Sequence, residues 1–105
     1  MVRTYKPYIP RSIGEVLDQL GFVFLRAPTF EDPAFPGQNI DSVFLQLNEG
    51  LEAVRKQLGE ERIQKLTTLS DKARAHFESD PNDENGGARE GRRIIREMEE
   101  MLERM

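Results

Sequence analysis

Apolar side chains recur at helical spacing over four stretches of the chain, at about residues 12–27, 40–58, 60–78 and 88–104. Spacings of three and four residues place these side chains on one face of a helix, and such a face packs against a core. The most regular stripe lies in the second stretch and consists of Ile40, Val43, Phe44, Leu47, Leu51, Val54 and Leu58. The pattern predicts an all-α fold, a compact bundle of about four helices.

Boundary signals support these helices. Ser12 followed by Glu15 matches a capping box at the start of the first helix, and Asn39 is a suitable N-cap for the second. Gly59 suits the position after the second helix, and the acidic residues 60–61 open the third as the helix dipole prefers. Because almost no linker separates the second and third helices, we expect them to form an antiparallel hairpin.

The end of the first helix allows two interpretations. Gly21 interrupts the apolar stripe, so Phe22–Leu25 could form a short strand instead of continuing the helix. A lone strand needs a partner, and no other segment alternates between apolar and polar residues. The helix is therefore predicted to continue to about Ala27 and to end at Pro28.

Three stretches lack helical periodicity, namely residues 1–11, 28–38 and 79–87. Prolines in the first stretch favour an extended N-terminal arm, which Tyr5 and Tyr8 are expected to pin to the body by burying their rings. The second stretch is a Pro-rich loop whose two rings, Phe30 and Phe35, are predicted to plug the core. The third is an acidic, glycine-rich loop.

Composition narrows the function classes. A length of 105 residues fits a single domain, and zero cysteines exclude disulfides and thiolate chemistry within it. A net charge of −4 argues against nucleic acid as a partner. No apolar run is long enough to span a membrane, and the N-terminus lacks the apolar region of a signal peptide. We therefore expect a cytoplasmic protein without membrane or nucleic-acid partners.

The last predicted helix carries its charges against its own dipole. Arginines occupy its first half and glutamates its second, whereas an isolated helix prefers the reverse by roughly 0.3–1 kcal/mol per charge. On a helical wheel these charges lie opposite Ile94, Ile95, Met98 and Met101. The candidate partner-binding residues are Arg89, Arg92, Arg93, Arg96, Glu100 and Glu103.

Two readings of this helix stay open. An antiparallel copy would set the arginine half against the glutamate half, which predicts a homodimer; another protein could take the same place. The charges could also be simply solvated, each contributing little. The methionines at 98, 101 and 105 have the same ambiguity, because they fit either a core or an adaptable binding face.

Candidate chemistry is sparse. His76 is the only histidine, and it lies beside the apolar stripe of the third helix, where it is a weak candidate site. The acidic run from Asp80 fails the calcium-loop template, with Asn85 where glycine is required and Gly91 where glutamate is required. The glycine-rich turn at residues 86–93 has the ingredients of an anion site but matches no phosphate-loop motif.

The sequence thus predicts a non-catalytic protein-interaction or regulatory protein that self-associates, with no cofactor, metal or catalytic residue. One alternative is an inhibitor of a basic partner protein, which is the role of immunity proteins and antitoxins. Another is a small anion-binding protein or enzyme that uses His76 or the Gly86–Arg93 turn.

Overall fold

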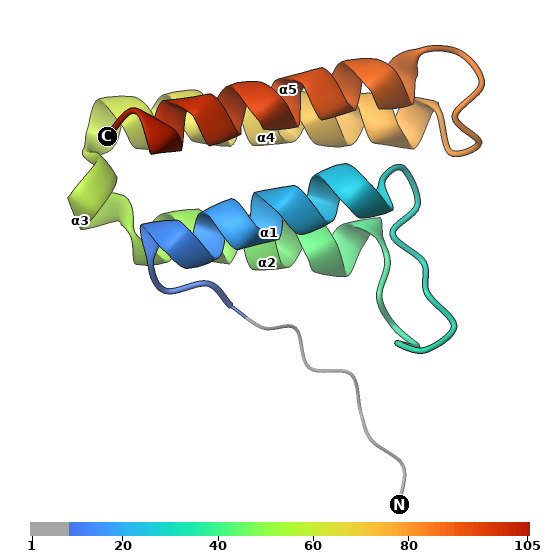
Figure 1. The fold of residues 1–105 in the computed structure, drawn as a ribbon, viewed down its shortest axis with the longest axis horizontal. Coiled ribbons are helices and arrows are strands. Elements are labelled where there is room, and N and C mark those ends of the chain that lie inside the picture. The colour runs from blue at the N-terminus through green and yellow to red at the C-terminus, as the bar shows by residue number, and fades with distance from the viewer. Residues whose placement is uncertain (1–8) are drawn as a thin grey trace, which may run out of the picture.

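The computed structural model describes residues 9–105, and this part of the chain is entirely helical apart from its loops. The helices are α1 (Ile13–Arg26), α2 (Ile40–Ala53), α3 (Arg55–Leu58), α4 (Glu60–Ser79) and α5 (Gly87–Glu103). The four long helices alternate in direction, and each packs against the next along the chain, while α5 returns to pack against α1 (Figure 1). The predicted all-α bundle is confirmed. None of the described helices is long and apolar enough to cross a membrane.

Ser12 is the N-cap of α1, as predicted, whereas the return bond of the predicted capping box comes from Arg11, one residue before the N-cap. The Ser12 hydroxyl accepts the N–H of Glu15 at 3.1 Å, and the Glu15 carboxylate accepts the N–H of Arg11 at 2.9 Å. The helix then continues through Phe22–Leu25, so the strand alternative is wrong and the helical one is confirmed. It ends before Pro28, whose ring disfavours a helical conformation in the preceding residue.

The predicted single helix over residues 40–58 is wrong at one point. It breaks at Val54, whose φ of −105° and ψ of 14° are not helical, and the short α3 turns the corner toward α4 (Figure 1). Val54 and Leu58 are both buried, which the turn makes possible at the end of the bundle. Arg55 spans the corner, with ion pairs of 2.6 Å to Glu52 and to Glu60 that raise the pKa of its guanidinium.

Three phenylalanine rings occupy the centre of the core. Phe30 comes from the loop between α1 and α2, Phe44 from α2 and Phe77 from α4. The ring centroid of Phe30 lies 5.9 Å from that of Phe44 and 5.6 Å from that of Phe77, in edge-to-face arrangements that such rings prefer. The expectation that Phe35 also plugs the core is wrong, because that side chain is 52% exposed.

The N-terminal arm is described only from Ile9 onward. Tyr5 and Tyr8, predicted to pin the arm, lie outside the described residues. Pro10 is buried, and a Cβ at Gly50 of α2 would lie only 2.9 Å from its ring. The segment just before α1 is therefore packed against the end of α2.

α4 and α5 approach each other closely because a glycine lies at their contact. A Cβ added to Gly91 would lie 2.5 Å from a ring carbon of Phe77, closer than packed carbon atoms come. Gly91 thus lets α5 rest directly on the ring that anchors the core.

Replacing Gly91 with alanine is expected to lower the free energy of unfolding by about 1–3 kcal/mol, because the added methyl overpacks the contact with Phe77. Gly21→Ala is the matched control. No atom of the described residues lies within 4 Å of a Cβ at that helical position, so the change should raise stability by about 0.5–1 kcal/mol. Urea denaturation of both variants measures the two effects. If the Gly91→Ala protein were as stable as the unmodified chain, the claim that Phe77 leaves no room for a methyl group at this position would be wrong.

Candidate protein-interaction surface

Two of the α5 arginines predicted to face a partner are engaged within the chain. Arg92 donates to the carbonyl of Ala27 at 3.0 Å and to Asp83 at 3.2 Å, and only 26% of its side chain is exposed. Arg96 places its guanidinium carbon 4.3 Å from the ring centroid of Phe24 in α1. Both residues therefore hold α5 against α1, which sequence spacing alone did not reveal.

The remaining candidates lie on the solvent side of α5. Arg93 donates to Glu90 at 2.8 Å, a contact that lowers the pKa of the Glu90 carboxyl, and it lies 3.7 Å from Glu97. Glu100 lies 3.9 Å from Arg104. Arg89 and Glu103 are exposed and form no hydrogen bond or ion pair with any residue of the described range 9–105. Together with Arg96, whose side chain is 62% exposed although it contacts Phe24, these positions form the outer face of α5, which we define as Arg89, Arg93, Arg96, Glu100 and Glu103.

Glu99, on the same helix, is shielded from solvent, unlike these candidates. Its side chain is only 14% exposed, and its Oε1 is buried without a hydrogen-bond partner in the described chain. Burial raises the pKa of Glu99, with Glu103 adding to the rise and Arg96, 3.9 Å away, opposing it. The charge on Glu99 therefore costs stability, and no sequence motif marks it.

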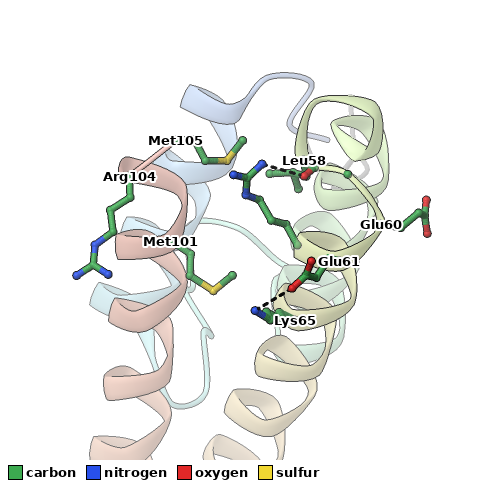
Figure 2. Close-up of a pocket in the computed structure, with 9 residues that line it drawn as sticks. Leu58, Glu60, Glu61, Lys65, Met101, Arg104 and Met105 are labelled. Atoms are coloured by element: carbon green, nitrogen blue, oxygen red, sulfur yellow. Dashed lines mark hydrogen bonds and ion pairs between the residues drawn. The ribbon is translucent and has the colours of Figure 1, made fainter.

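The methionines of α5 divide between core and surface. Met98 is fully buried, whereas Met101 is half-buried and Met105 is 46% exposed. Figure 2 shows Met101 and Met105 turned toward the space between α4 and α5, with Arg104 and Glu60 pointing away from it. The core interpretation thus holds for Met98, whereas Met101 and Met105 are accessible to solvent.

This space is a groove of about 580 Å³ between the start of α4 and the end of α5. We call it the α4–α5 groove; it is lined by residues 58–62, Lys65, Met101, Arg104 and Met105. A second hollow of about 410 Å³ continues it past Leu69 and Glu97 and shares Lys65 and Met101 with it. Lys65 pairs with Glu61 at 3.4 Å across the groove wall (Figure 2). The result is an apolar floor with charged walls.

The loop after α1 forms a second exposed feature. Its backbone is fixed by bonds from Ala34 N–H to the Asp32 carboxylate at 2.9 Å and from the Gln38 side chain to the Phe30 carbonyl at 2.7 Å. Asp32 also pairs with Arg26 at 3.5 Å. Phe35 is nevertheless half exposed, beside a hollow of about 600 Å³ lined by the loop itself. The loop is held in place while it presents an aromatic ring.

In the acidic loop before α5, backbone N–H groups stabilise the carboxylate of Asp80. Asp80 is 2% exposed, and its carboxylate accepts the N–H groups of Ala88 at 2.9 Å, Glu84 at 2.7 Å and Asn85 at 3.2 Å. These bonds lower the pKa of the Asp80 carboxyl, and the bond from Ala88 has the largest effect. An N-terminal helix end attracts anions, and here the chain's own carboxylate occupies that position.

His76 lies half-buried on α4, one turn before this loop. Its carbonyl accepts the Ser79 hydroxyl at 2.7 Å. Within residues 9–105 no group of three or more histidine, cysteine, aspartate or glutamate side chains is placed to hold a metal ion. Three surface features therefore remain as candidate interaction surfaces: the α4–α5 groove, the outer face of α5 and the loop that carries Phe35.

Glu99→Gln is expected to stabilise the fold by about 1 kcal/mol near neutral pH, since it removes a charge that is buried without a hydrogen bond. The sign follows from linkage: a raised folded-state pKa costs stability above that pKa, and the cost disappears as pH falls through it. Thermal unfolding should show Tm rising by about 4–8 °C. The difference between variant and parent should shrink on acidification, and a less stable variant at neutral pH would contradict the assignment.

No protein-family model matches the chain, and neither a curated protein nor a solved structure matches it significantly. The function therefore has to be argued from the chain's own surfaces.

Proposed function

We propose that the chain is a non-catalytic protein-interaction module that associates with a second copy of itself through the α4–α5 hairpin. The observation that carries this proposal is the α4–α5 groove, where Met101 and Met105 remain accessible beside the charged outer face of α5. Flexible, polarisable methionine side chains adapt to irregular partner surfaces.

The arrangement has the composition of a binding site between proteins. Such sites combine an apolar centre with a polar rim, and the rim sets orientation more than affinity. In this chain the centre is Met101 with Leu69, and the rim includes Lys65 and Glu97. A two-fold dimer is the commonest way for one surface to serve both partners.

A second candidate function is the regulation of a basic partner protein. It is favoured by the loop that presents Phe35, because residues 27–41 contain three acids and neither lysine nor arginine. An aromatic side chain held in place before binding loses little entropy on binding, and exposed aromatics often dominate binding energy. The partner in this case would offer an apolar pocket with basic side chains around it.

Size-exclusion chromatography with light scattering should give twice the mass of one chain at high protein concentration and low salt. Met101→Ser should weaken association, because it removes apolar contact area from the groove. Leu45→Ser is the control, since Leu45 is 50% exposed on α2, outside the groove. A monomeric mass at every concentration would overturn self-association.

The second candidate can be tested with a random peptide library displayed on phage and selected on the intact protein. Selected peptides should be rich in lysine, arginine and apolar residues, and Phe35→Ser should weaken their binding by about tenfold or more. Leu25→Ser, at a position 80% exposed on α1, should leave binding unchanged. Peptides that bind the Phe35→Ser protein equally well would rule out this loop as the binding site.

A further inference from the structure

Within the described part of the chain, the outer face of α5 has an unpaired charge near each end. Arg89 lies in its first turn and Glu103 in its last, and neither has a partner within the described residues. They are separated by about 21 Å, the length of fourteen residues at the helical rise of about 1.5 Å. Opposite charges at the two ends of one face make that face complementary to a reversed copy of itself.

We propose that the α5 helices of two copies pair antiparallel across a two-fold axis that passes beside Arg96. This inference rests on the proposed function, and it specifies which residues meet. In this register Arg89 faces Glu103 of the partner subunit, and the symmetry repeats the contact at the opposite end. The two groups left unpaired in one chain thereby neutralise each other between chains.

The same register gives a second layer of pairs. Arg93 then faces Glu100 of the partner subunit, one turn closer to the axis. Among residues 9–105 the Glu100 carboxylate has a single ion pair, with Arg104 at 3.9 Å. Arg93 lies 3.7 Å from Glu97 and donates to Glu90 from one edge of its guanidinium, a group with five N–H donors. Both residues can therefore form a contact with the other chain.

Like charges do not block the axis. Arg96 would meet its own copy there, but its guanidinium is drawn sideways to the ring of Phe24, 4.3 Å away in α1. Glu99 lies 3.9 Å from it, and the opposite charge partly offsets the repulsion between the two arginines. The two Arg96 guanidinium groups therefore do not point at each other at the centre of the paired faces.

Other occupants fit this face less well. A polyanion would be repelled by Glu100 and Glu103, and a basic surface would be repelled by Arg89 and Arg93. A reversed copy matches both halves at once. Because exposed ion pairs contribute little affinity, they fix the register here. The α4–α5 groove, with Met101 and Met105, lies on the α4 flank of the same helix.

Charge reversal tests the register. Arg89→Glu and Glu103→Arg each place like charges at both symmetric contacts, so each should raise the dissociation constant of the dimer about tenfold or more in sedimentation equilibrium at low salt. The double variant Arg89→Glu/Glu103→Arg restores opposite charges and should return to within about threefold of the parent. An equimolar mixture of the two single variants should form heterodimers, because all its contacts are again attractive.

Matched controls carry the same charge changes on another face. Lys56→Glu in α3 and Glu49→Arg in α2 alter exposed residues that form no ion pair with the outer face of α5, and both should leave dimerisation unchanged. Thermal unfolding of the Arg89 and Glu103 variants should match the parent, since both side chains are exposed.

The outcomes separate the register from the proposed function. A parent protein that stays monomeric overturns both. A dimer that is indifferent to Arg89→Glu and Glu103→Arg, or single variants that weaken it without rescue in the double variant and the mixture, overturn the register and leave self-association standing. Rescue in both the double variant and the mixture supports it.

Discussion

The ring of Phe77 is the contact on which the rest of the bundle depends. On one side it packs with Phe30 and Phe44, which joins α4 to α2 and to the loop after α1. On the other side Gly91 of α5 rests against it without room for a Cβ. One side chain thus positions three helices and a loop relative to each other. Because a close-packed interior transmits even a methyl-sized change, this contact fixes where α5 lies.

The position of α5 determines what its side chains can do. With Gly91 against Phe77, Arg92 points toward the carbonyl of Ala27 and Arg96 toward Phe24. These two cationic side chains therefore hold α5 against α1. The same placement leaves Arg89 and Glu103 in solvent and leaves Met101 between α4 and α5. The charges that looked alike along the sequence therefore divide into structural contacts and an open surface.

The two buried carboxylates, Asp80 and Glu99, show which side-chain environments can be predicted from neighbouring residues in the sequence. Asp80 lies in a turn-forming segment, and the bonds that it accepts come from residues within eight positions, so a local interpretation of the acidic loop was adequate. Glu99 follows a different rule. It lies next to Glu100 and two positions from Glu97, both of which are solvated, yet only 14% of its own side chain is exposed. Nothing in its neighbouring residues distinguishes it.

The sequence by itself determined the helices, because apolar periodicity, Ser12, Asn39 and the glycines act within a few residues of each other. It also determined that α5 has an apolar face and a charged one. Only the tertiary structure decided the break at Val54, the exposure of Phe35 and the separate roles of the arginines. Each of these depends on atoms far away in sequence, and a local pattern carries no information about which distant surface a side chain meets.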